Sequence, residues 1–170
     1  MTQHFDLTGY HDGRHTTVGA LTGNLAELVG AMRHDDGTLI AIAKFTDHRY
    51  VQIWADRDGV VIGEVISNLN IGDAIALTPE DELALKGLEF NEPSPRPNPN
   101  WWLQCDDDQG CLVLTSKLVK AIYQVLHQEP NNSVVVTTWE VDPHPDSDGH
   151  EARANNRVYR QEDCDQGDTI

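Results

Sequence analysis

The sequence predicts an α+β domain, in which an antiparallel sheet built around a three-stranded meander has helices packed on one face. The stretch from Thr38 to Ser67 contains three apolar runs separated by two short polar turns. Its middle run, from Tyr50 to Ala55, alternates between two sets of side chains, which is the period of a strand with two distinguishable faces. Stretches with apolar residues at helical spacing precede and follow the meander.

Turn residues separate the three runs of the meander. Asp58-Gly59 is a recognised hairpin signal, because glycine accepts the positive φ that such turns need. Thr46-Asp47-His48 can close the preceding hairpin. In the first run Leu39, Ala41, Ala43 and Phe45 share one face, while Ile40, Ile42 and Lys44 share the other. Both faces of the sheet are therefore partly apolar, and the expected helices cover only one of them.

Three helices and two further strands surround the meander in the prediction. Apolar residues recur every three or four positions over 17–32, which indicates an amphipathic helix. Thr78-Pro79-Glu80-Asp81 has the cap, proline and acids of a helix start, and this helix continues to about Phe90. A third helix is capped by Thr115 or Ser116 and runs to Leu126. Residues 101–105 and 134–141 are the remaining strands, so the predicted order is α-β-β-β-α-β-α-β.

The composition changes at both ends of this folded region. Residues 1–15 are polar and histidine-rich and are expected to form a flexible arm, and residues 16–142 form the single α+β domain. Residues 143–170 are acidic and almost free of apolar residues, so they cannot supply a core and are expected to be disordered.

The charge limits the classes of partner. The chain has 28 acidic and 12 basic side chains and a net charge of −16, which argues against nucleic acid and membrane surfaces and makes basic or amphipathic peptides better candidates. The simpler interpretation, which we favour, is that the acidity keeps a cytosolic protein soluble. No basic region followed by an apolar run begins the chain, and no apolar stretch is long enough to span a membrane. Three cysteines without regular spacing define no disulfide framework. We therefore expect a cytoplasmic protein.

Short motifs suggest chemistry only weakly. Asp106, Asp108 and Gly110 resemble the opening of a calcium loop, but the bidentate acid expected further along is missing, so an acidic turn is favoured. Cys105 and Cys111 flank that turn. A zinc site would need two more ligands, and a catalytic thiol would need an adjacent base, and the sequence places neither. No catalytic motif occurs, and we expect no catalytic residue, no metal site and no cofactor.

Aromatic side chains give the candidate binding surface. Tyr50, Gln52 and Trp54 share the second face of the meander. Trp101 and Trp102 are adjacent, so in a strand they point to opposite faces and one of them cannot face the helices. An exposed aromatic side chain on a sheet commonly marks a subunit contact or a ligand surface. We predict that these five residues contribute to a binding surface.

Several segments together resemble a known family. They are RYVQIWADRDGVVIGEVISN, LTPEDELALKGLEFNEPSP, NWW and TSKLVKAIYQVLHQEP, and they resemble the N-terminal domain of the actinobacterial TY-Chap proteins. That group is similar to type III secretion chaperones and YbjN-like proteins, so the resemblance implies their type of α-β-β-β-α-β-β-α fold over Thr17 to Val141. The family usually has Leu-Gly-Trp where this chain has Leu88-Glu89-Phe90.

The resemblance implies a non-catalytic, dimeric, chaperone-like domain that holds peptide or protein segments on its sheet surface. One alternative is a structural or regulatory subunit that meets one folded partner through the same face. Another is a metal- or thiol-dependent enzyme built on Cys105, Cys111 and the turn from Asp106 to Asp108.

Overall fold

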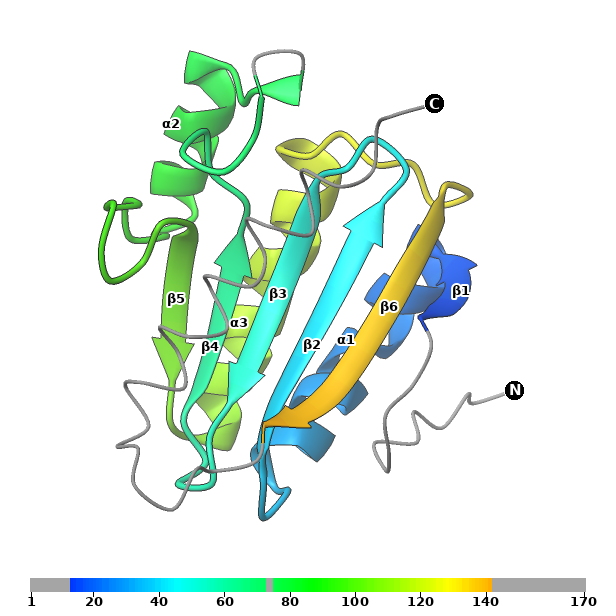
Figure 1. Ribbon diagram of the computed structural model, residues 1–170, viewed down its shortest axis with the longest axis vertical. Helices are drawn as coiled ribbons and strands as arrows, with labels where there is room; N and C mark the ends of the chain where they lie inside the picture. Colours follow the sequence, from blue (N-terminus) through cyan, green and yellow to red (C-terminus); the bar gives the residue numbers. More distant parts are fainter. Residues whose placement is uncertain (1–12, 73–74, 142–170) are drawn as a thin grey trace. The chain divides into compact units, whose positions relative to one another are not determined.

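Six strands form one antiparallel sheet in the computed structural model of the chain (Figure 1). The structure describes residues 13–72 and 75–141. The strand order across the sheet is β1-β6-β2-β3-β4-β5. The elements are β1 (Arg14–Thr17), α1 (Val18–Arg33), β2 (Thr38–Phe45), β3 (Tyr50–Ala55), β4 (Val61–Val65), α2 (Pro79–Gly87), β5 (Trp101–Cys105), α3 (Asp108–Gln124) and β6 (Ser133–Val141). The predicted α+β class and sheet are confirmed, and one strand, β1, is added at the start.

The meander of β2, β3 and β4 is closed by two turns with left-handed residues. His48, between β2 and β3, has φ of 69°, and Gly59, between β3 and β4, has φ of 77°. The carboxylate of Asp56 accepts hydrogen bonds from the amides of Asp58 and Val60, each at 3.0 Å. This side chain satisfies turn amides that the strand ladder does not use. Glycine meets the positive φ at residue 59 without a steric penalty.

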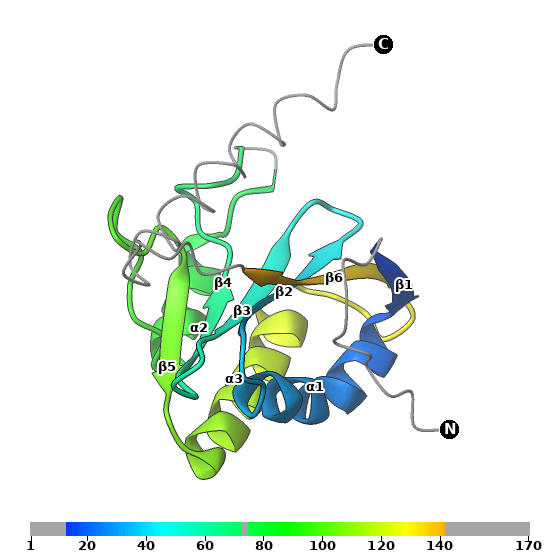
Figure 2. The same ribbon diagram turned by 60° about the horizontal axis from the view of Figure 1, so that its bottom comes forward.

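The two long helices cover one face of the sheet, as Figure 2 shows from its edge. Leu39, Ala41, Ala43 and Phe45 of β2 belong to the core on this side, in agreement with the predicted alternation. The apolar stripe of α1 is buried, with no side chain more than 1% exposed: Val18, Leu21, Leu25, Leu28, Val29 and Met32. On β4, a Cβ added at Gly63 would lie 2.8 Å from Leu114 Cδ1. Glycine therefore lets α3 approach the middle of the sheet closely.

Helix α3 begins at Asp108, seven residues before Thr115, the first of the two predicted caps, Thr115 and Ser116. Its N-cap is Asp107, whose carboxylate accepts a hydrogen bond from the amide of Gly110 at 2.5 Å. Thr115 instead lies inside the helix, where its hydroxyl donates to the carbonyl of Cys111 at 2.8 Å. Prediction of the cap at Thr115 was wrong because Asp107 is an equally good capping residue. The predicted acidic turn over 106–110 consequently contains the N-cap and the first helical residues of α3.

Strand β1 pairs with β6 and has no apolar pattern that could have predicted it. Arg14 and His15, assigned above to the arm, lie opposite Val136 and Val135. Three of its four side chains are exposed, so β1 stabilises the sheet mainly through its backbone hydrogen bonds with β6. Thr17 then caps α1 by accepting from the amide of Ala20 at 3.2 Å.

Some predictions concern residues outside these described ranges. They include the tail, residues 143–170, with Cys164, and residues 1–12 of the arm. Within the described ranges, no helix has the length and apolar character needed to cross a bilayer.

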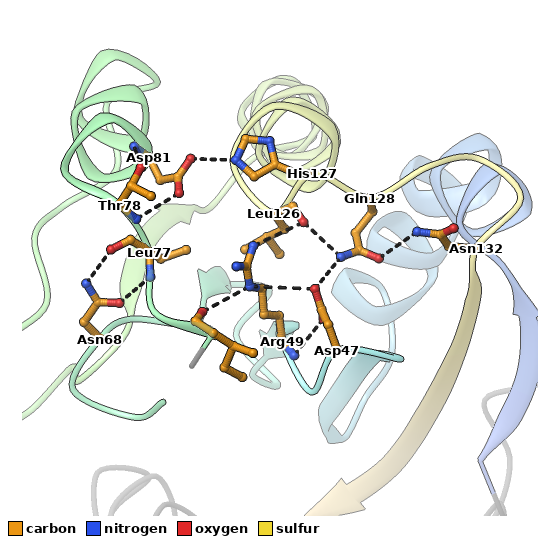
Figure 3. Close-up of polar contacts among 11 residues, drawn as sticks. Asp47, Arg49, Asn68, Leu77, Thr78, Asp81, Leu126, His127, Gln128 and Asn132 are labelled. Atoms are coloured by element: carbon orange, nitrogen blue, oxygen red, sulfur yellow. Dashed lines mark hydrogen bonds and ion pairs between the residues drawn. The ribbon is translucent and has the colours of Figure 1, made fainter. Parts of the chain in front are cut away.

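A polar network joins one end of the meander to the helices (Figure 3). The guanidinium of Arg49 donates from Nε to the carbonyl of Ile75 at 3.2 Å and from Nη1 to the carbonyl of Leu126 at 3.4 Å. Gln128 donates from Nε2 to Asp47 Oδ2 at 3.0 Å. The turn between β2 and β3 is thereby tied to the segment after α3 and to the connection that precedes α2.

Asp81 connects α2 to the same region. Its carboxylate accepts from the amide of Thr78 at 2.9 Å, while its own amide donates to the Thr78 hydroxyl at 3.2 Å, which completes a capping box. The other oxygen lies 2.8 Å from His127 Nε2. Burial raises the pKa of the Asp81 carboxyl, but the hydrogen bonds with Thr78 and the contact with His127 outweigh it and hold that pKa below its ordinary value of 3.8.

Replacement of Asp81 by alanine should lower the free energy of unfolding by about 1–2 kcal/mol near neutral pH, because it removes the carboxylate that accepts from the Thr78 amide in the capping box and contacts His127. A carboxyl whose folded pKa is lowered stabilises above its unfolded pKa of 3.8 and loses this contribution as the pH falls through the folded value. The difference between wild type and Asp81→Ala should therefore shrink below about pH 4. Denaturant unfolding at about pH 7 and pH 3 measures it.

Glu80→Ala is the matched control, because Glu80 is an exposed acid in the same helical turn. It should change the stability much less than Asp81→Ala does. Equal losses in the two variants, or a loss at Asp81 that is independent of pH, would contradict the assigned role.

Candidate functional site

The candidate site is the sheet face opposite α1 and α3, which we call the outer face. Successive side chains of a strand point to opposite sides of the sheet, so the residues that alternate with core residues lie here. In the described part of the chain, both long helices lie on the other side (Figure 2). Two rows of directly opposite residues form the centre of this face: Ile40, Trp54 and Ile62, and then Ile42, Gln52, Glu64 and Trp102.

The first row is an apolar cluster distinct from the main core. In the full chain Ile40, Trp54 and Ile62 are 0%, 3% and 5% exposed, yet none of them belongs to the core cluster under the helices. The indole Nε1–H of Trp54 is buried and has no acceptor among the described residues. A buried donor without an acceptor costs about 1–3 kcal/mol, so this group gains from any carbonyl brought to it.

The second row contains buried polar groups. Gln52 and Glu64 lie opposite each other and are 0% and 1% exposed. Glu64 Oε2 accepts from Asn100 Nδ2 at 3.0 Å. Asn100 also donates to the Tyr50 hydroxyl at 3.3 Å and accepts from Asn70 Nδ2 at 2.7 Å. These contacts hold a carboxylate at a fixed position beside the apolar row.

Of the five residues predicted to bind, Gln52, Trp54 and Trp102 occupy the two rows, and Tyr50 lies at the end of the same side of β3. Trp102 is half-buried, and its backbone pairs with that of Asn91. Trp101 points to the helix side, where it is 2% exposed and part of the main core. The alternation predicted for the adjacent tryptophans is thus observed, and Trp102 is the one that lies outside. A role of these residues in binding stays a prediction.

The structure adds residues that the binding prediction did not include. Ile40 and Ile62 complete the apolar row, and their place on the second face is visible in the alternation of the meander. The same alternation along the meander also places Glu64 on the second face. Asn100 had none, because it is 36 residues from Glu64 and follows a proline-rich segment.

The region considered for metal or thiol chemistry lies at the opposite end of β5 from Asn100. Cys105 ends β5 and Cys111 lies in the first turn of α3, and both are buried free thiols. Asp108 contacts Arg33 of α1 at 2.8 Å and His34 at 3.1 Å. In the part of the chain that the structure describes, no group of three or more His, Cys, Asp or Glu side chains is arranged to hold a metal ion.

Comparisons with known proteins give one match. Neither the curated proteins nor the solved structures contain one that matches the chain. A family model does match, over residues 19–140. This range covers every element from α1 to β6 and leaves out only the first residue of α1 and the last residue of β6. Its description is "T3SS (YopN, CesT) and YbjN peptide-binding chaperone 3". The chain therefore belongs to the TY-Chap3 family of peptide-binding, chaperone-like proteins.

Proposed function

We propose that this chain is a non-catalytic chaperone-like domain that holds extended client segments against the outer face of its sheet. The observation that carries the proposal is the apolar row of Ile40, Trp54 and Ile62, which lies on the face opposite the two long helices. These three side chains are not part of the core under the helices, so they supply a separate apolar surface against which a client segment would pack. Membership of a peptide-binding family supports the same assignment.

The chemistry of the face indicates which segments it would hold. An extended peptide presents alternate side chains to a surface, so apolar residues at every second position fit the apolar row. Trp54 Nε1–H offers a donor to a peptide carbonyl. The carboxylate of Glu64, in the next row, and the net charge of −16 favour lysine or arginine in the client. The expected client segment is therefore extended, apolar at alternate positions, and basic.

We further propose that the chain acts in the cytoplasm and forms a homodimer. Support for a subunit contact comes from Leu112 and Val113 on α3, which are 56% and 45% exposed. Adjacent large apolar side chains on the surface of a helix are typical of contacts between subunits. They lie on the helix side of the sheet, so dimerisation through them leaves the outer face available to a client.

Peptide binding is tested with a labelled panel in which apolar residues alternate with lysine, alongside the same peptides with glutamate in place of lysine. We expect the full chain to bind the lysine series more tightly. Glu64→Gln should weaken binding of the lysine series about tenfold, which corresponds to 1.4 kcal/mol, and leave the glutamate series nearly unchanged. Fluorescence anisotropy titrations measure the affinities.

Glu129→Gln provides the matched charge control, because Glu129 is exposed on the loop between α3 and β6. A panel in which no peptide binds, together with a single folded protein that copurifies in fixed stoichiometry, would contradict the proposal. Equal effects of Glu64→Gln and Glu129→Gln would show that net charge, and not the outer face, governs binding.

Trp54→Phe tests the indole donor, since phenylalanine keeps an aromatic ring and removes the N–H. It should weaken binding of every peptide about threefold to tenfold, the value of one hydrogen bond. Trp101→Phe is the control, because it makes the same chemical change at a buried indole on the helix side. Equal losses of affinity in Trp54→Phe and Trp101→Phe would contradict a role for the Trp54 indole N–H as a donor to the peptide.

Dimerisation is tested with the double change Leu112→Ser and Val113→Ser. Removing two apolar side chains from an interface should raise the dimer dissociation constant by about 100-fold, as measured by sedimentation velocity over a range of concentrations. Leu83→Ser, at a side chain that is 69% exposed on α2, should leave the constant unchanged. A wild-type chain that is monomeric at every concentration would rule out the dimer.

A further inference from the structure

Two cysteine side chains meet at the junction between β5 and α3. Cys105 is the last residue of β5, and Cys111 lies in the first turn of α3. Their Sγ atoms are 2.6 Å apart, and the two residues are 8% and 5% exposed. The structure describes both as free thiols. Five residues lie between them in the chain, so the contact is local and is made within one protomer.

The sequence around the two cysteines brings them together. Asp107 caps α3 and starts the helix directly after β5. A Cβ added at Gly110 would lie 3.0 Å from Cys105 Cβ, so glycine allows the first helical turn to lie against the end of the strand. Arg33 of α1 donates to the carbonyl of Asp106 at 2.7 Å and to the carboxylate of Asp108 at 2.8 Å. The segment between the cysteines is thus held at both its start and its middle.

We propose that Cys105 and Cys111 are a redox-active dithiol that a peroxide-class oxidant converts to an intramolecular disulfide. One thiolate attacks a peroxide oxygen, the O–O bond breaks, and a sulfenic acid and water form. The second thiolate attacks that sulfur, the S–S bond forms, the S–O bond breaks, and a second water leaves. Two thiols lose two electrons in total, and one hydrogen peroxide gains them and becomes two waters. This inference is independent of peptide binding at the outer face.

Peroxide suits this site because it is small enough to reach largely buried sulfurs. Burial raises the pKa of the Cys105 thiol, and its contact with Cys111 raises it further. Since the thiolate is the reactive form, oxidation should be slow near neutral pH and should accelerate as the pH rises. In a reducing cytoplasm such a disulfide forms transiently under oxidative conditions and is reduced afterwards.

The disulfide would join the end of an edge strand to the helix that covers the sheet. β5 is the last strand in the order, and its Trp102 belongs to the outer face. A bond that closes a short loop stabilises the fold by restricting the unfolded chain. Oxidation should therefore raise the melting temperature and restrict motion at the β5–α3 junction. Reduction should return the melting temperature to that of the dithiol form.

The test uses the full chain with Cys164→Ser, which removes the one other cysteine. After hydrogen peroxide treatment, both remaining thiols should resist alkylation. Cleavage before the aspartates at positions 106–108 separates the two cysteines, so the fragments should stay joined until a reductant is added. The melting temperature should rise by about 5–10 °C on oxidation and fall back on reduction.

Cys105→Ser and Cys111→Ser in the same background are the controls, and neither should show a reversible rise in melting temperature. Their melting curves without oxidant show whether each variant folds. Two alkylatable thiols after peroxide treatment, oxidation of a single sulfur to sulfinic acid without a linked fragment, or a disulfide between two chains would each overturn the proposal.

Discussion

The strict alternation of side chains along β2, β3 and β4 is the constraint on which the rest of the structure depends. Because α1 and α3 bury one face, each residue of the meander is assigned either to the core or to the outer face. A slip of one residue would turn Trp54 towards the helices and Ile53 away from them. The left-handed residues His48 and Gly59 set the turn geometry that fixes this register. The hairpin turns therefore determine the chemistry of the outer face although they contribute no side chain to its two rows.

Features with strong local signals could be predicted from the sequence. The stripe of α1 has helical spacing throughout, and the capping residue Thr78 is followed by proline and acids at the positions that helices prefer. The start of α3 was misplaced because Thr115 and Asp107 are both good caps, and propensity alone does not choose between them. β1 had no signal, since a short polar strand with exposed side chains is specified by its partner β6.

The details of the candidate site depend on contacts between distant residues. Alternation indicates that Trp101 and Trp102 point to opposite sides, but which one is buried depends on the pairing of β5 with β4. Asn100 reaches Glu64 because it directly precedes β5, whose first residue Trp101 pairs with Val65 at the end of β4, and no periodicity relates the two positions. The contact between Cys105 and Cys111 likewise required the early start of α3, which places Cys111 in the first turn. These tertiary contacts decide the chemistry, whereas local patterns decide the fold.

The central claim is that an extended basic client lies on the outer face, and the four tryptophans report on it separately. The most direct measurement is a two-dimensional NMR titration of the ¹⁵N-labelled chain with an alternating apolar and lysine peptide, in which the indole N–H signals are followed. We expect saturable shifts for the indole signals of Trp54 and Trp102, and almost no shift for Trp101, which is buried in the core. Saturable binding that leaves Trp54 and Trp102 unchanged would contradict it and would place the client on another surface.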